Sequence, residues 1–245
     1  MHSTPEKIPE APQPKRQDEA VSQDIEDFIY LISHDVRSSV RALLELPQWI
    51  AEDLEEAGFK MGGQVQSSID LMNRHTGRLD RMLVDLLTYS RVGRMQTVRE
   101  VDLDVALDDV LDELPVPNSF QIIRSLDCRS LVIGDRDILT LLTSLISNAI
   151  KHHDRKGGKI VVTSSRGNGR VKISVSDDGP GIPEEFHTRV FGAMTTLRPR
   201  DEVEGSGMGL ANVRKIATHY HGTARLLPSP YGRGVMVEVS LPEAE

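Results

Sequence analysis

The sequence has 245 residues, 38% of them hydrophobic and 27% charged, which is the composition of a globular protein with one or two packed domains. No apolar run reaches the roughly 18 to 20 residues that span a bilayer, and the N-terminus lacks the basic-then-apolar order of a secretory signal. The net charge of −8 argues against a nucleic-acid surface, and the single cysteine, Cys128, excludes an internal disulfide. We therefore expect a cytoplasmic protein with no membrane segment in this chain and no nucleic-acid partner.

The first part of the chain is predicted to be a polar tail followed by two long helices. Residues 1–20 combine four prolines with charged and small polar residues, so we expect a disordered tail there. Apolar residues recur at helical spacing over residues 25–54, which predicts one amphipathic helix, kinked or weakened at Pro47. After a glycine-rich turn at 58–63, the same periodicity over 65–91 predicts a second helix. Such a hairpin buries only one stripe, so we expect it to pair with a second copy into a four-helix bundle.

The rest of the chain alternates between short strands and amphipathic helices. Two pairs of alternating segments are typical of β-hairpins, one joined by Gly167-Asn168-Gly169 and the other by a turn at 229–232. Strands are predicted at 97–101, 119–126, 130–133, 159–165, 170–176, 223–228 and 234–241, and helices at 102–114, 135–152 and 207–220. The expected fold class is therefore α+β: a helical hairpin at 21–93 and, at 97–245, an α/β sandwich with one layer of helices on one sheet.

A histidine lies near the middle of the first predicted helix, in the segment Ser33-His34-Asp35. An exposed neutral imidazole is a good nucleophile. Asp35 could hold the tautomer of the His34 ring and accept a proton while the other ring nitrogen attacks phosphorus. His-Asp pairs are common on helix surfaces, so an ordinary surface histidine is the alternative interpretation of this segment alone.

Two glycine-rich segments are candidates for binding a nucleotide. In Asp177–Gly181, which directly follows an apolar strand, Asp177 could accept a hydrogen bond from an adenine amino group while the glycines let the backbone approach the base. The alternative is a tight surface turn. Gly205–Leu210 opens a predicted helix, where glycine-flanked amides form an anion site suited to a triphosphate. A Rossmann turn or a P-loop does not fit, because no buried strand precedes this segment and no Gly-Lys-Ser/Thr follows it.

The helix predicted at 135–152 ends in a polar segment that contains Asn148 and Lys151. A carboxamide oxygen is a hard ligand suited to a Mg²⁺ ion that bridges phosphates, and a lysine nearly one turn away could neutralise phosphate charge. The alternative is a polar helix end whose lysine compensates the helix dipole.

The four segments occur in the order typical of sensor histidine kinases, and the chain resembles that family from about residue 25 to residue 241. The resemblance implies a dimerisation and histidine phosphotransfer domain at 21–93, followed by a GHKL-type ATP-binding domain at 97–245. It implies that a homodimer phosphorylates its own histidine from Mg²⁺ and ATP and passes the phosphoryl group to an aspartate of a response-regulator receiver domain. Within the family, the lid segment Phe191–Leu210 is similar to that of the phytochrome-like kinases.

The resemblance also assigns roles to single residues. It implies that His34 is the phosphoacceptor, that Asp35 activates it, and that Asn148 is the Mg²⁺ ligand. The other residues implied to bind ATP are the phosphate contact Lys151, the adenine anchor Asp177, the first glycine box Gly179 and Gly181, and the second glycine box Gly205, Gly207, Gly209 and Leu210.

Five positions depart from the family pattern. Asp35 replaces the usual glutamate, Ser39 a frequent proline, and Ser144 a second asparagine of the Asn148 helix. The lid motif at 191–194 lacks its second aromatic residue, and Ser38 stands where Thr or Asn often supports dephosphorylation of the partner. We expect these changes to affect the kinase rate and any phosphatase activity more than ATP binding.

Two other functions stay open for this sequence. A dimeric phosphotransfer adaptor with little kinase activity would share the architecture, but such proteins typically lose the glycine boxes that this chain keeps. A GHKL protein that phosphorylates serine on a partner or only hydrolyses ATP is the other alternative, and the hairpin carrying His34 argues against it.

Overall fold

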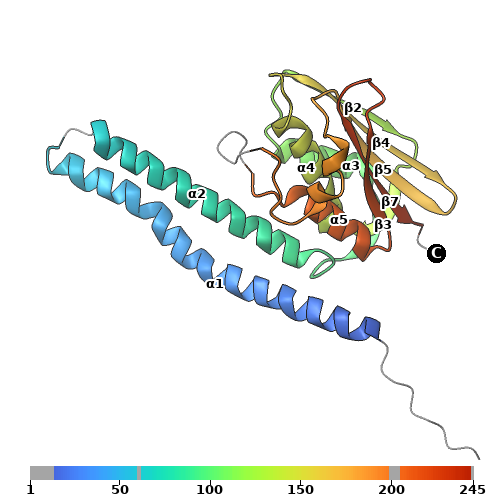
Figure 1. Cartoon of the computed structure of the whole chain (residues 1–245), viewed down its shortest axis with the longest axis horizontal. Coiled ribbons are helices and arrows are strands. Elements are labelled where there is room, and N and C mark those ends of the chain that lie inside the picture. The colour runs from blue at the N-terminus through green and yellow to red at the C-terminus, as the bar shows by residue number, and fades with distance from the viewer. Residues whose placement is uncertain (1–13, 60–61, 199–204, 244–245) are drawn as a thin grey trace, which may run out of the picture.

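The first described part of the chain forms a long helical hairpin (Figure 1). The structure, a computed structural model, describes residues 14–59, 62–198 and 205–243, and it describes side chains from residue 29 onward except that of His34. Helix α1 (Pro14–Glu56) and helix α2 (Gly63–Arg91) run antiparallel. Helix α1 begins inside the predicted tail, so the expectation of disorder is wrong for residues 14–20. Proline suits a first helical turn, and the residues after Pro14 are mostly good helix formers. Residues 1–13 lie outside the described part of the chain.

A narrow apolar seam holds the two helices together. Val40 of α1 is buried there with Ile69, Leu83 and Leu87 of α2. Pro47 is also buried inside α1, where its missing N–H breaks the helical hydrogen-bond ladder, and Figure 1 shows α1 as a bent helix. Other apolar side chains of the hairpin are exposed: Leu31, Ile32, Val36, Leu43, Leu46, Trp49, Ile50, Val65, Leu71, Met72, Leu79 and Val84. Within the described ranges, no helix has the length and apolarity that crossing a membrane requires.

The second unit is an α/β sandwich, as predicted. Its helices are α3 (Leu103–Glu113), α4 (Asp135–Lys151) and α5 (Gly209–His219). Its strands are β1 (Val98–Asp102), β2 (Phe120–Leu126), β3 (Ser130–Gly134), β4 (Gly158–Gly167), β5 (Arg170–Asp177), β6 (Thr223–Pro228) and β7 (Val235–Pro242). Helix α3 begins where predicted because the Asp102 carboxylate accepts hydrogen bonds from the backbone N–H groups of Asp104 and Val105.

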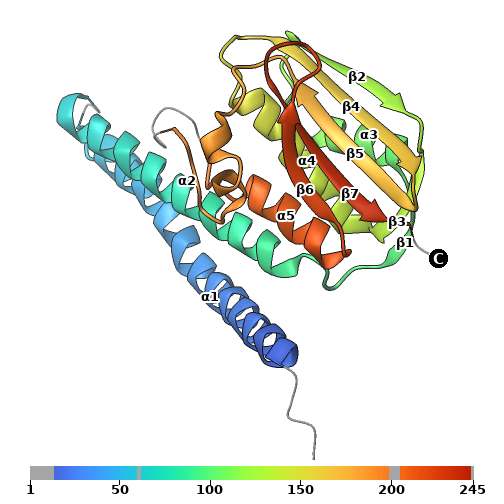
Figure 2. The same cartoon turned by 45° about the vertical axis from the view of Figure 1, so that its right-hand side comes forward.

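Five of these strands form one mixed sheet in the order β2-β4-β5-β7-β6. Strands β2 and β4 are parallel, and the other neighbours are antiparallel. Strands β1 and β3 pair separately as a small antiparallel sheet, which the sequence did not predict. Figure 2 shows α4 and α5 beside the five-stranded sheet, with α2 running along the outer side of α5.

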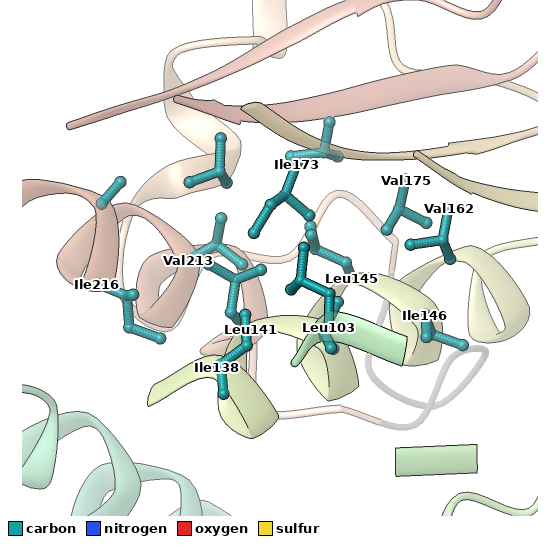
Figure 3. Close-up of a cluster of buried hydrophobic side chains, with 14 of the residues drawn as sticks. Leu103, Ile138, Leu141, Leu145, Ile146, Val162, Ile173, Val175, Val213 and Ile216 are labelled. Carbon is teal, nitrogen blue, oxygen red and sulfur yellow. The ribbon is translucent and has the colours of Figure 1, made fainter. Parts of the chain in front are cut away.

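The core lies between the helical layer and one face of the sheet (Figure 3). Alternate residues of each strand point into it, as in β5, where Val171, Ile173 and Val175 are buried. Helix α4 contributes the largest share from one helix, with Ile138, Leu141, Leu142, Leu145 and Ile146 each at most 2% exposed. This packing fixes α4 and α5 against the sheet, and therefore fixes the polar residues at their ends.

A buried polar cluster ties the end of α2 to the sandwich. We call Gly93, Gln96, Asp137 and Tyr220 the linker clamp. Asp137, 2% exposed, accepts hydrogen bonds from the Gly93 N–H at 3.1 Å, the Gln96 side-chain amide at 2.6 Å and the Tyr220 hydroxyl at 2.8 Å. Burial and the bond to Asp137 raise the pKa of Tyr220, so its hydroxyl stays a donor. The clamp joins the segment between the two units to both α4 and α5.

Helix α5 also contacts α2 directly. The Lys215 ammonium donates a hydrogen bond of 2.7 Å to the Tyr89 carbonyl and lies 4.4 Å from the centre of the Tyr89 ring. Together with the linker clamp, this contact holds the sandwich beside the C-terminal part of the hairpin.

Candidate functional site

A cavity of about 310 Å³ opens between α4, the end of β5 and the start of α5. Eight of the sequence-predicted residues line it: Asn148, Lys151, Asp177, Gly181, Gly205, Gly207, Gly209 and Leu210. Its volume is at the lower end of the range for small-molecule sites, and its wall combines apolar with polar groups. The fold therefore brings three distant segments of the sequence to one cavity, because α4, β5 and α5 are neighbours in the sandwich.

Asp177 lines the cavity, and its carboxylate is held in place by backbone groups. One carboxylate oxygen, Oδ1, accepts hydrogen bonds from the backbone N–H of Gly179 at 2.9 Å and of Val235 at 3.4 Å. No hydrogen bond to Oδ2 is found in the described residues. Burial raises the pKa of the carboxyl, an effect that the two backbone donors partly offset. One oxygen is thus fixed by the protein while the other can accept from a ligand.

Gly179 is not among the residues that line the cavity, but it contacts Asp177, which does. Its N–H holds Asp177, and a Cβ at this position would lie only 2.9 Å from the Asp177 carboxylate. Gly181, with φ of +77°, does line the cavity and passes beside the backbone of Gly234. Of the two glycines in this segment, Gly179 positions the Asp177 carboxylate and Gly181 forms part of the cavity wall.

A second group of polar residues holds the turn after β5 in place through Asp178. The Asp178 carboxylate accepts hydrogen bonds from the Lys159 N–H at 2.7 Å and from the buried His153 ring at 3.2 Å. These donors, the Lys159 N–H first, hold the pKa of Asp178 below its usual value. Arg233 donates to the Asp178 carbonyl at 3.0 Å and also pairs with Asp154. The turn after β5 is therefore held by hydrogen bonds from Lys159, His153 and Arg233.

The glycine segment before α5 is shaped for close approach of backbone groups. Gly207 has a φ of +77°, and a Cβ there would come within 2.8 Å of the backbone of Met194 and Thr195. Gly209 starts α5, and a Cβ on it would lie 3.1 Å from the Asn148 side chain. Only glycine fits both positions without a shift, so the amides at the start of α5 stay accessible to an anion.

Asn148 and Lys151 occupy the last turn of α4 and face the same cavity. In the described part of the chain, no cluster of three or more His, Cys, Asp or Glu residues could hold a metal ion. A divalent cation here would therefore take most of its ligands from phosphates and water, with the Asn148 oxygen as a hard protein ligand. That arrangement suits Mg²⁺, which usually keeps several waters and few protein ligands.

His34 and Asp35 lie in α1, away from the eight residues on the cavity wall. The side chain of His34 is outside the described residues, and Asp35 is exposed. The Arg91 guanidinium lies 5.5 Å from the Tyr30 ring, which aligns the two helices there. Position 34, one turn further along α1, is therefore level with the turn of α2 that carries Asp85. Asp85 itself lines the cavity, so the cavity faces the hairpin at the level of His34.

Several cavity residues were not predicted from the sequence. Asp85 contributes from α2, Arg198 from the lid segment, and Asn212 from the first turns of α5. Asn212 is 4% exposed, and its side-chain oxygen has no hydrogen-bond partner among the described residues. In the sequence, Asn212 is a polar residue among the apolar residues of the inner face of α5. Helical periodicity reveals this exception but does not indicate what the side chain binds.

Comparison with known families finds a match for the second unit. Residues 134–245 match the family described as histidine kinase-, DNA gyrase B- and HSP90-like ATPase. The chain is 26% identical over 227 residues to phytochrome-like protein Cph1 of Synechocystis sp., and 30% identical over 233 residues to methanogenesis regulatory histidine kinase FilI of Methanothrix harundinacea. Each alignment covers 91% of this chain, which spans only 30% and 25% of the two relatives.

Solved structures share the fold of both units. The full-length ShkA complex with AMPPNP matches 89% of this chain and 46% of that protein, at 23% identity and a TM-score of 0.66. The complex of histidine kinase ThkA with response regulator protein TrrA matches 94% of this chain and 66% of that protein, at 21% identity and a TM-score of 0.62. The predicted fold, a helical hairpin followed by an α/β sandwich, is confirmed by these matches.

Proposed function

We propose that this chain, which joins a helical hairpin to an ATPase domain in the manner of the sensor histidine kinases, is an ATP-dependent protein-histidine kinase that phosphorylates His34. One observation carries the proposal: the cavity that gathers the predicted nucleotide residues also has Asp85 of α2 in its wall, level with position 34. A nucleotide in this cavity would therefore lie beside the hairpin, as transfer to His34 requires.

The cavity residues fit the parts of ATP. Asp177, with one oxygen held by backbone donors and the other open, suits the adenine amino group. The amides from Gly205 to Gly209 suit the phosphates, and Lys151 adds positive charge beside them. Asn148 would hold Mg²⁺, which when bound neutralises charge on the phosphates and on the departing ADP.

The reaction itself is a displacement at phosphorus. A ring nitrogen of His34 forms a bond to the γ-phosphorus while the bond from that phosphorus to the β,γ-bridging oxygen breaks, and ADP leaves. We propose that Asp35, the next residue of α1, holds the ring tautomer and takes the ring proton. The phosphoryl group then passes to an aspartate of a response-regulator receiver domain, regenerating His34.

We also propose partners and a location. The exposed apolar side chains of α1 and α2 make a second copy of this chain the natural occupant of that surface, giving a four-helix bundle. ThkA has been solved with a response regulator, and this chain has the same fold over 94% of its length, which supports a receiver-domain partner here. A reaction that consumes ATP fits a cytoplasmic location, and the match to Cph1 supports a place near the phytochrome-like kinases.

The test is incubation with γ-labelled ATP and Mg²⁺, comparing the wild type with His34→Ala and Asp177→Asn. Label on the wild-type protein that is lost in acid, is stable in base and is absent from both variants would support the proposal. An unlabelled wild type that still dimerises and accepts a phosphoryl group from a phosphorylated receiver would instead establish the phosphotransfer adaptor. Label on serine would establish the third alternative.

A further inference from the structure

Two carboxamide side chains line the cavity, one from α4 (Asn148) and one from α5 (Asn212). Helices α4 and α5 are antiparallel, because Asn148 near the end of α4 lies against Gly209 at the start of α5, while Asp137 at the start of α4 bonds Tyr220 at the end of α5. Asn212 follows Gly209 by three residues and so lies on the same face of α5. The two asparagines therefore stand about one turn apart along facing helices.

The direction of side chains on a helix makes these two converge. Each Cα–Cβ bond of an α-helix tilts toward the N-terminus of that helix. The Asn148 side chain consequently leans toward the level of Asn212, and the Asn212 side chain leans back toward Gly209 and Asn148. Both residues line the cavity, together with the short Ser144 one turn before Asn148, which leaves room between the helices at that level.

The hydrogen-bonding capacity of the pair is complementary and unused. The Asn212 side-chain oxygen is buried without a partner in the described residues, which is costly in a packed interior. The buried oxygen is closed to solvent, so a neighbouring side chain is better placed than water to satisfy it. Asn148 makes no side-chain hydrogen bond in the described part of the chain, and its amide nitrogen is a donor that can turn toward Asn212.

We propose that Asn212 is a positioning residue for Asn148. In the nucleotide-bound protein, the Asn148 side-chain N–H donates to the Asn212 oxygen, which turns the Asn148 oxygen toward the cavity and the Mg²⁺ ion that accompanies the nucleotide. The proposal rests on the proposed function, because it gives Asn212 its role through the binding of Mg²⁺ and ATP. Residues that orient a metal ligand in this way typically change metal affinity tenfold or more when they are replaced.

The experiment measures the affinity of the full chain for AMPPNP by calorimetry, once with MgCl₂ and once with EDTA. Asn212→Leu, which keeps the number and branching of the side-chain heavy atoms but removes the acceptor, is compared with the wild type, with Asn148→Ala and with the double variant. We expect Asn212→Leu to weaken binding about tenfold with Mg²⁺, to change it less than twofold with EDTA, and to have no further effect in the Asn148→Ala background. Because the substitution removes an unpaired buried oxygen, the melting temperature without nucleotide should stay equal or rise. Thr218→Val, on the exposed face of α5, should match the wild type in every measurement.

Three results would overturn the inference while leaving the kinase proposal intact. The first is that Asn212→Leu leaves the AMPPNP affinity with Mg²⁺ unchanged. The second is that it lowers this affinity equally with Mg²⁺ and with EDTA. The third is that it lowers the affinity equally in the wild-type and Asn148→Ala backgrounds. A lower melting temperature with unchanged affinity would assign Asn212 a structural role only. A wild type that binds no AMPPNP under either condition would refute the proposed function, and this inference with it.

Discussion

Removing a single oxygen atom from Tyr220 should measurably weaken the sandwich. In Tyr220→Phe, the ring that packs beside α4 stays, but the hydroxyl no longer donates to Asp137 at 2.8 Å or accepts from the Gly134 N–H at 2.9 Å. Gly134 is buried and pairs with Val98 in the β1–β3 ladder. These two residues form a pair without backbone hydrogen bonds between them, because the next residue, Asp135, donates its N–H to the Thr97 carbonyl. The hydroxyl is therefore the acceptor on which the Gly134 N–H depends.

The size of the effect follows from these two bonds. A hydrogen bond to a charged group contributes about 1.5 to 3 kcal/mol, and a buried N–H left without an acceptor costs about 1 to 3 kcal/mol. Asp137 keeps its donors from Gly93 and Gln96, so it is not left unpaired. We expect a loss of about 3 kcal/mol in the free energy of unfolding, or about 9 °C in the melting temperature of a domain of this size.

The assay is calorimetric melting of the full chain with and without the substitution. The matched control is Tyr231→Phe, because that ring is 42% exposed, lies 5.0 Å from the Lys159 ammonium and has no hydroxyl partner among the described residues. The control should stay within about 0.5 kcal/mol of the wild type. If Tyr220→Phe costs no more than the control, the linker clamp does not stabilise the sandwich and the reasoning from these bonds is wrong.

Three further substitutions test other parts of the structure. Gly207→Ala should weaken AMPPNP binding at least tenfold, because φ is +77° and a Cβ meets the lid backbone, whereas Gly167→Ala, outside the cavity lining and with nothing within 4 Å, should bind normally in the same titration. Because burial raises the pKa of Asp177 above its ordinary 3.8, the native state keeps this proton to higher pH than the unfolded chain, so stability falls as pH rises through that window. In urea titrations at a series of pH values, the free energy of unfolding of Asp177→Asn should fall less as pH rises than that of the wild type. An unchanged pH dependence would contradict the raised pKa of Asp177. Lys215→Met should speed proteolysis between α2 and β1 several-fold, by removing its bond to the Tyr89 carbonyl, and an unchanged cleavage rate would mean that the contact does not restrain the linker.

Short sequence patterns predicted helices and strands well where turn residues or a capping side chain determine the structure. The β4–β5 hairpin forms at Gly167-Asn168-Gly169, where Asn168 and Gly169 both have positive φ, as a tight hairpin turn requires. Helix α3 starts after Asp102 because that side chain caps it. Helix α5 begins two residues later than predicted, because the left-handed backbone of Gly207 cannot be part of a helix.

The sequence could not predict the contacts that depend on the arrangement of the elements in space. The linker clamp joins Gly93 to Asp137, 44 residues apart, and Asp137 to Tyr220, 83 residues apart. No periodicity or spacing rule relates such positions. The same holds for Asn212, whose unpaired oxygen becomes visible only once α5 is packed against α4. The candidate nucleotide residues were found because their segments keep recognisable local chemistry, whereas the residues that hold them in place do not.

The position of β7 in the sheet has a consequence for protein synthesis. Strand β7 follows the other strands of this sheet in the sequence, yet it lies between β5 and β6 rather than at an edge. On the ribosome, β6 therefore emerges before the strand that connects it to the rest of the sheet, while the α1–α2 hairpin, built from contacts closer in sequence, can already form. The cavity wall includes Val235 and Val237 of β7. The nascent chain consequently cannot complete its nucleotide cavity until residues 235–242 have left the exit tunnel, and until then β6 and the open edge of β5 are exposed to other chains.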